Sequence, residues 1–189
     1  KNLTFSFGFR CDFLKLEEQF IISKAVSVGI AKYLEEKMGM PILLKWPNDI
    51  LVENQKICGI LLETKIVERK RYMIVGIGLN VNQTSFNTNY AATSLSLEFG
   101  KLMDLDTELD FLLTYLRRSL AKLRGSRLDE IDNDYLSRLK GTKKFIAFED
   151  NLGKFNGKII YANNSGEITV KTDEGNLKYY RTGQVKISY

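Results

Sequence analysis

The chain has 189 residues, 28 Lys and Arg against 23 Asp and Glu, a formal charge of +5 and no histidine. The missing histidine excludes Ser-His-Asp and Cys-His catalysis and any zinc site that needs an imidazole. Its apolar runs are too short to span a membrane, and its mild positive charge is far below that of a dedicated nucleic-acid binder. Cys11 and Cys58 are too few and too far apart for a disulfide framework, which predicts a reducing cytoplasm.

The first half of the chain predicts a strand, an amphipathic helix and a meander of three strands, the first of which is interrupted at Pro47. Gly39 and Pro41 are the stop signal of the helix. Pro47 interrupts an apolar run and predicts a bend between two strands. Short links between the later strands are typical of antiparallel pairing. The expected ranges, in chain order, are 2–9, 17–38, 42–46, 50–52, 56–63 and 72–81.

The second half predicts a polar loop, three helices and then several short strands. Leucines at helical spacing support the longest of these helices, and Gly125 marks its end. After Gly141 the pattern changes to short strands separated by turns, which is typical of a small barrel. We therefore expect one unit at 1–141 and a second at 142–189. The loop is expected at 83–94, the helices at 95–102, 106–124 and 129–139, and the strands at 145–148, 157–161, 168–171 and 177–180.

Glycines gather on one face of the predicted strand that starts at Tyr72. Glycine inside a strand usually marks close approach by a ligand or another backbone, and a tight sheet–helix contact explains it equally well. Period-two alternation places Tyr72, Ile74, Gly76, Gly78, Asn80 and Asn82 on this face. In the neighbouring strand it places Ile57, Gly59, Leu61 and Glu63 on one side, and Lys56, Cys58, Ile60 and Leu62 on the other.

Each polar residue near these glycines also has an ordinary structural interpretation. Lys56 and Lys45 alone would be solvated surface lysines, because lysine is almost never fully buried. Trp46 is more often a core or pocket-wall residue than a reactive group, and Asp49 after Pro-Asn is typical of a turn. Cys58 has apolar neighbours and is interpreted as inert packing. Spacing alone therefore predicts a glycine-floored sheet edged by lysine, tryptophan and amide groups, without naming a reaction.

Three motifs together resemble those of the biotin protein ligase family. Residues 45–49 read Lys-Trp-Pro-Asn-Asp, residues 56–63 read Lys-Ile-Cys-Gly-Ile-Leu-Leu-Glu, and residues 75–82 read Val-Gly-Ile-Gly-Leu-Asn-Val-Asn. Their order and short separations also match the family. Residues 92–95 are similar to a further recurrent segment, and residues 142–189 are similar to the family's C-terminal domain.

The resemblance implies a fold and a reaction. The fold would be α+β, with a mixed sheet and helices like those of class II aminoacyl-tRNA synthetases and lipoate ligases, followed by an SH3-like small β-barrel. The reaction would join biotin to ATP with Mg²⁺, giving biotinyl-5′-AMP and pyrophosphate. The biotinyl group would then pass to a lysine of a biotin carboxyl carrier domain of acetyl-CoA carboxylase or a related carboxylase. The resemblance also allows a homodimer, and it requires no histidine.

The resemblance also implies roles for particular residues. Lys56 matches the catalytic lysine that contacts biotin and the adenylate phosphate, where a fixed cation would offset the negative charges brought together. Asp49 would orient or deprotonate the acceptor lysine, and no residue is predicted to ligate a metal. The biotin- and adenylate-binding set would be Lys56, Trp46, Asn48, Gly59, Ile60, Leu61, Gly76, Gly78, Leu79 and Asn80.

The family's Gly-Arg-rich loop and its upstream Ser/Thr-x-Asn biotin contacts have no match in these residues. We expect them to precede Lys1, and we expect the 189 residues alone to make biotinyl-AMP poorly or not at all. Two alternatives remain at this point. One is a lipoate–protein ligase, and the other is a non-catalytic module that binds a partner through the basic C-terminal barrel.

Overall fold

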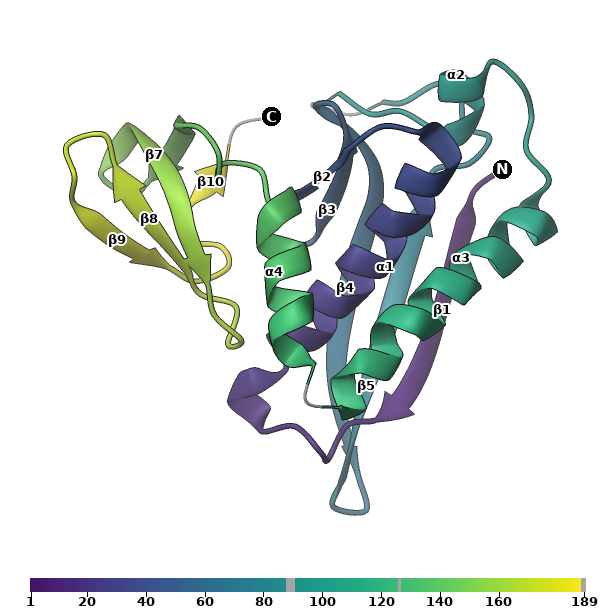
Figure 1. Ribbon diagram of the computed structural model, residues 1–189, viewed down its shortest axis with the longest axis horizontal. Coiled ribbons are helices and arrows are strands. Elements are labelled where there is room, and N and C mark those ends of the chain that lie inside the picture. Colours follow the sequence, from purple (N-terminus) through teal and green to yellow (C-terminus); the bar gives the residue numbers. More distant parts are fainter. Residues whose placement is uncertain (88–90, 126, 188–189) are drawn as a thin grey trace.

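Five antiparallel strands form the first sheet of the computed structural model, which describes residues 1–87, 91–125 and 127–187 (Figure 1). Their order is β1-β5-β4-β3-β2, so the expected meander is confirmed. All its ladders are antiparallel, whereas the resemblance implied a mixed sheet. Residues 88–90 of the expected polar loop lie outside the described residues. The strands are β1 (Leu3–Arg10), β2 (Ile42–Lys45), β3 (Asp49–Val52), β4 (Gln55–Val67) and β5 (Lys70–Leu79).

The helices of the first unit cover one face of this sheet (Figure 1). Helix α1 (Phe20–Met38) lies against the sheet, and α3 (Leu105–Ala121) and α4 (Leu128–Arg138) pack on it. Because α1 has neighbours on several sides, most of it is buried, and the expected one-sided apolar stripe is wrong. Gly39 ends α1 with φ +66°, a left-handed conformation that glycine adopts readily. The shorter helical elements are η1 (Leu16–Glu18), α2 (Leu95–Phe99) and η2 (Lys122–Arg124).

The sheet separates a buried face from a more open one. Along β5, Met73, Val75, Ile77 and Leu79 are buried and belong to the hydrophobic core. The alternate positions, which include Gly76 and Gly78, face away from this core and are only partly buried. The alternation expected for this strand is therefore confirmed, and both glycines lie on the open face.

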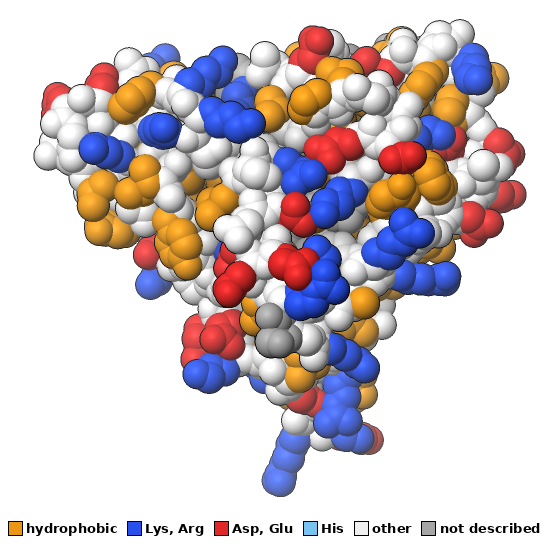
Figure 2. Space-filling model, viewed as in Figure 1, with side chains coloured by type: hydrophobic (Ala, Val, Ile, Leu, Met, Phe, Trp, Pro, Cys, Tyr) orange, Lys and Arg blue, Asp and Glu red, His pale blue; other side chains and the backbone are white. Residues whose placement is uncertain are grey.

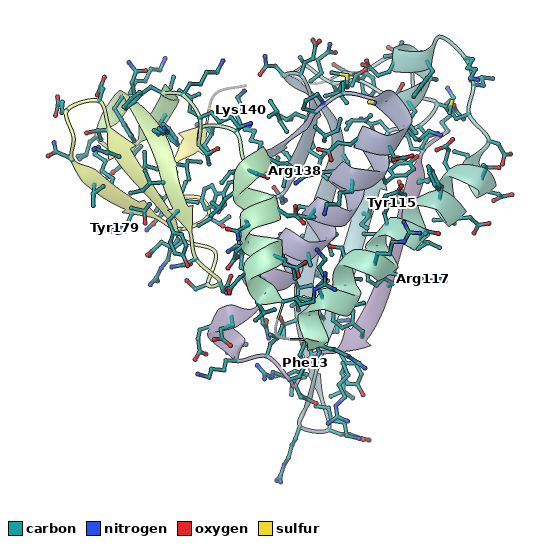
Figure 3. All side chains as sticks on the ribbon, in the orientation of Figure 1. Phe13, Tyr115, Arg117, Arg138, Lys140 and Tyr179 are labelled. Atoms are coloured by element: carbon teal, nitrogen blue, oxygen red, sulfur yellow. The ribbon has the colours of Figure 1, made fainter. Side chains whose placement is uncertain are left out.

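Charged side chains fasten the helices to one another inside the first unit. Arg138 of α4 makes two hydrogen bonds of 2.9 Å with the carboxylate of Glu35 on α1 (Figure 3). Glu108 of α3 is 3% exposed; it accepts hydrogen bonds from the Tyr33 hydroxyl and, at 2.8 Å, from the Lys37 ammonium. Burial and the Glu108 carboxylate both raise the pKa of Tyr33.

A second antiparallel sheet follows α4 and has the order β10-β6-β7-β8-β9. Strands β10 and β9 are its two edges and are not paired with each other in the described residues. The sheet is therefore open, and the expected SH3-like barrel is not confirmed. No helix in the described ranges is long and apolar enough to cross a membrane. The strands are β6 (Ile146–Asp150), β7 (Gly153–Ala162), β8 (Ile168–Thr172), β9 (Leu177–Tyr180) and β10 (Lys186–Ile187).

A buried lysine joins the second sheet to the first unit. The Lys24 ammonium on α1 donates to the Asp132 carboxylate at 2.6 Å, the Ala162 carbonyl at 2.6 Å and the Asn164 amide oxygen at 2.9 Å. These three acceptors match the three N–H donors of an ammonium group, which offsets its burial. Burial lowers the pKa of Lys24, and Asp132 opposes this shift.

Candidate functional site

A β-bulge turns Lys56 onto the open face of the first sheet. Between β3 and β4, Ile50 pairs with Cys58 and Leu51 pairs with Lys56, so Ile57 is an extra residue in β4. Such an extra residue shifts the alternation of the strand by one. The expectation that Lys56 lies on the opposite side from Gly59 is therefore wrong. A methyl group on Gly59 would lie 3.3 Å from both Cε and Nζ of Lys56.

The Lys56 ammonium forms an ion pair with Asp49 on this face. The Nζ–Oδ1 distance is 2.5 Å, and the side chains are 25% and 13% exposed, respectively. Asp49 lies directly opposite Gly59 in the β3–β4 ladder. The bend at Pro47 positions this pair, because it ends β2 at Lys45 and starts β3 at Asp49.

Lys56 borders a small cavity whose floor is made of glycine. The cavity has a volume of about 190 Å³, and Gly59 and Gly78, which pair across β4 and β5, both line it. A methyl group on Gly78 would meet no atom of the described residues within 4 Å, so this part of the floor has room for one. The described residues that line it are Lys56, Cys58, Gly59, Gly78, Asn80, Gln83, Phe86 and Ala92.

Hydrogen bonds fix Asn80 and the segment around Ala92 beside Lys56. The Asn80 amide nitrogen donates to the carbonyls of Thr93 at 3.0 Å and of Lys56 at 3.5 Å. The backbone of Lys56 bonds to Ala91 and Thr93, which makes an isolated parallel bridge with Ala92. Lys56 and Asn80 are therefore positioned by one backbone network.

Burial and neighbouring charges shift the pKa values of two further groups near the Lys56–Asp49 pair. Lys45 is only partly exposed, and its pKa falls to about 8, chiefly because of burial. Asp49 opposes this fall, while the ammonium groups of Lys140 and Lys56 add to it. The fully buried Cys58 thiol has its pKa raised to about 12 by burial, which fits its interpretation as inert packing.

Several predicted site residues lie outside the small cavity. Trp46 is 3% exposed, and its indole nitrogen donates to the Gly166 carbonyl at 3.0 Å. The Asn48 amide donates to the Ile60 carbonyl at 2.8 Å, and the Ile60 amide donates back to Asn48 at 3.0 Å. Ile60 and Leu79 are in the core, while Leu61 and Gly76 lie next to each other on the open face.

Sequence reasoning did not single out three of the cavity residues. Gln83 and Phe86 belong to the polar loop, where no periodicity indicates which side chains turn inward. Ala92 belongs to a segment that the family resemblance marked as recurrent, and that signal could have placed it at the site. Its pairing with Lys56 gives the segment a structural reason.

Comparison with known proteins shows which family this sequence resembles. Residues 1–80 match the sequence model of the biotin/lipoate A/B protein ligase family. The bifunctional ligase/repressor BirA of Bacillus subtilis is 30% identical over 159 residues, which are 82% of this chain and 49% of the relative. The chain belongs to the biotin protein ligase family. The resemblance carried by the three motifs is thus confirmed.

Solved structures of this family share the fold. The biotin protein ligase from Aquifex aeolicus in complex with biotin and ATP superposes with a TM-score of 0.79 and 26% identity. The superposition covers 99% of this chain and 78% of that protein. Biotin–[acetyl-CoA-carboxylase] ligase of Mycobacterium tuberculosis is 42% identical over 57 residues, 30% of this chain and 20% of the relative. The chain spans about half the length of the Bacillus relative.

Proposed function

We propose that this chain carries the adenylate-forming site of a biotin protein ligase. The observation that carries the proposal is the position of the Lys56 ammonium beside Gly59, at the edge of a cavity that Gly78 and Asn80 also line. An open glycine floor lets a flat nucleotide approach the backbone closely. A fixed cation at its edge stabilises negative charge that gathers as a carboxylate approaches a phosphate.

In the first step a biotin carboxylate oxygen would bond to the α-phosphorus of ATP. The bond from that phosphorus to the bridging oxygen breaks, and pyrophosphate leaves with the electron pair. Lys56 would exchange part of its contact with Asp49 for the phosphate oxygens and hold the charge there. In the described residues no group of three or more Cys, Asp or Glu side chains could hold a metal ion. Mg²⁺, which the resemblance implies, would offset charge on the ATP phosphates.

In the second step the acceptor lysine of a biotin carboxyl carrier domain would attack the acyl carbon. AMP leaves with the electron pair, and the amine loses a proton. Asp49 would orient the amine and accept this proton, because its carboxylate lies beside Lys56 on the same face. Asp49→Asn should slow transfer to the carrier more than it slows pyrophosphate release. Equal slowing of both steps would contradict this role.

A partner protein would dock at the outer edge of β4, which pairs with β3 only from Gln55 to Gly59. The following residues pair with β5 on the other side, and a cavity of about 390 Å³ borders Leu62 and Thr64. The Gln19 amide nitrogen there is buried without a hydrogen-bond partner in the described residues. An added strand from the carrier domain, or from a second copy in a homodimer, would form backbone hydrogen bonds along this edge of β4. A cytoplasmic location also stays a prediction.

The experiment is a calorimetric titration of the chain with biotinyl-5′-AMP. Biotin-dependent pyrophosphate release is measured on an N-terminally extended version, because the 189 residues alone are expected to make biotinyl-AMP poorly or not at all. Lys56→Ala should weaken adenylate binding at least about tenfold and lower the release rate on the order of a hundredfold. Lys65→Ala is the control, because this exposed lysine lies toward the far end of β4. Unchanged binding and release in Lys56→Ala would overturn the proposal. Preferential use of lipoate over biotin would support the lipoate ligase instead.

A further inference from the structure

A second, larger cavity lies on the same sheet face as Lys45, at the junction of the two sheets. Its volume is about 680 Å³, and it is bounded by Leu43 of β2 and by the segment from α4 to β6. Leu43 and Lys45 are two residues apart on one strand, so their side chains share a face. Lys45 therefore lies between this cavity and the Lys56–Asp49 pair, which it meets across the β2–β3 ladder.

Lysine side chains crowd around this cavity. Lys140, Lys143 and Lys144 all line it, and Glu53 is the one carboxylate among the described lining residues. Within the described residues no salt bridge joins Lys143 or Lys144 to a carboxylate. Figure 3 shows Lys140 at the end of α4 where the chain crosses to the second sheet, and Figure 2 shows basic side chains gathered over this junction.

The charges of these lysines also influence one another in the direction of the adenylate site. The charges of Lys140 and Lys56 both lower the pKa of Lys45, and the charge of Lys144 lowers the pKa of Lys140. Cations held this close, partly out of water, repel one another and concentrate a positive potential. A compact anion of high charge would relieve that repulsion, whereas a single carboxylate would do so only in part.

We propose that the Lys140–Lys143–Lys144 cavity binds inorganic pyrophosphate, and that Lys45 links this cavity to the site where pyrophosphate is released. The inference rests on the proposed function, since that reaction produces pyrophosphate on the same sheet face. Phosphate oxygens accept charge-assisted hydrogen bonds from ammonium groups, and several lysines can share one such anion. The cavity volume admits pyrophosphate or the polyphosphate tail of a nucleotide.

The test is calorimetric titration of the 189-residue chain with inorganic pyrophosphate, without biotin, ATP or Mg²⁺. The double variant Lys143→Gln/Lys144→Gln should weaken binding at least about tenfold, which corresponds to the loss of about one charge-assisted contact. The matched control, Lys65→Gln/Lys70→Gln, removes two exposed lysines at the β4–β5 hairpin and should change affinity less than about twofold. Circular dichroism verifies that both double variants stay folded, and Lys143→Gln alone should weaken binding by a smaller factor.

The titration distinguishes this inference from the proposed ligase function, because it needs no catalysis. Inorganic phosphate and AMP should bind more weakly than pyrophosphate, since each carries one phosphoryl group. The inference is overturned if the wild-type chain does not bind pyrophosphate at millimolar concentration, or if both double variants lose affinity equally. Tighter binding of a single-stranded oligonucleotide at this cavity would also overturn it and assign the lysines to nucleic acid. Failure of the chain to bind biotinyl-5′-AMP would overturn the proposed function and leave the measured pyrophosphate affinity valid.

Discussion

The indole nitrogen of Trp46 donates a hydrogen bond of 3.0 Å to the carbonyl of Gly166. This bond joins the end of β2, just before the bend that positions Asp49, to the turn between β7 and β8. The bond is buried, and Trp46 itself is 3% exposed. The aromatic residue of the most recognisable motif thus fastens the second sheet to the first.

Trp46→Phe should therefore destabilise the chain. The substitution keeps an aromatic ring but leaves the buried Gly166 carbonyl without its donor, at a cost of about 1–3 kcal/mol. Urea unfolding followed by circular dichroism measures this change. Tyr179→Phe is the control, because Tyr179 is 60% exposed and should change stability by less than about 0.5 kcal/mol (Figure 3). Equal unfolding midpoints for Trp46→Phe and the wild type would contradict the structural role of this bond.

Lys24→Met should lower the free energy of unfolding more than Trp46→Phe does. It removes three hydrogen bonds and leaves Asp132, whose side chain is 20% exposed, without its cation. We expect a loss of about 2–4 kcal/mol in the free energy of unfolding, somewhat below a fully buried pair. Lys32→Met removes a more exposed ion pair with Asp134 from the same helix and should cost less than about 1 kcal/mol. The expectation fails if the two variants unfold at the same urea concentration.

Gly59→Ala and Gly78→Ala form a matched pair that separates Lys56 placement from ligand access. A methyl group on Gly59 would lie 3.3 Å from the Lys56 side chain, whereas one on Gly78 would meet nothing within 4 Å in the part of the chain that the structure describes. Gly78→Ala should leave the unfolding free energy nearly unchanged and yet weaken biotinyl-5′-AMP binding. Gly59→Ala should weaken binding as well and shift the Lys56 ammonium resonance measured by NMR. Wild-type affinity in Gly78→Ala would show that the ligand does not approach this floor.

Lys45 should make stability depend on pH above neutrality. Its pKa is about 8 in the folded chain, compared with about 10.4 in the unfolded chain, so the unfolded state binds more protons between these values. Stability contributed by Lys45 must then rise with pH across this window, because its buried charge is lost. We expect the wild type to gain on the order of 1–3 kcal/mol relative to Lys45→Met between pH 8 and pH 10. Urea unfolding at several pH values measures the difference, and parallel profiles for the two proteins would exclude the shift.

Sequence patterns alone predicted the strands, helices and glycine face with few errors. The alternation in β5 and the stop at Gly39 depend on neighbours along the chain, and such local rules survive folding. The alternation expected for β4 holds from Cys58 onward but failed at Lys56 and Ile57, because the bulge at Ile57 arises from pairing with β3, a relationship that one strand does not encode. The barrel expectation rested on the spacing of short strands and on the family resemblance, whereas closure depends on edge pairing.

By itself the sequence determined the order of elements, the bend at Pro47 and the three motifs that mark the family. Tertiary structure decided which charged side chains lie close together. It turned Lys56 toward Gly59, set Lys45 between Lys56 and Lys140, and gave Trp46 its partner in the second sheet. The physical reason is that periodicity fixes which side of an element a residue occupies, whereas burial and charge proximity depend on segments far apart in the chain.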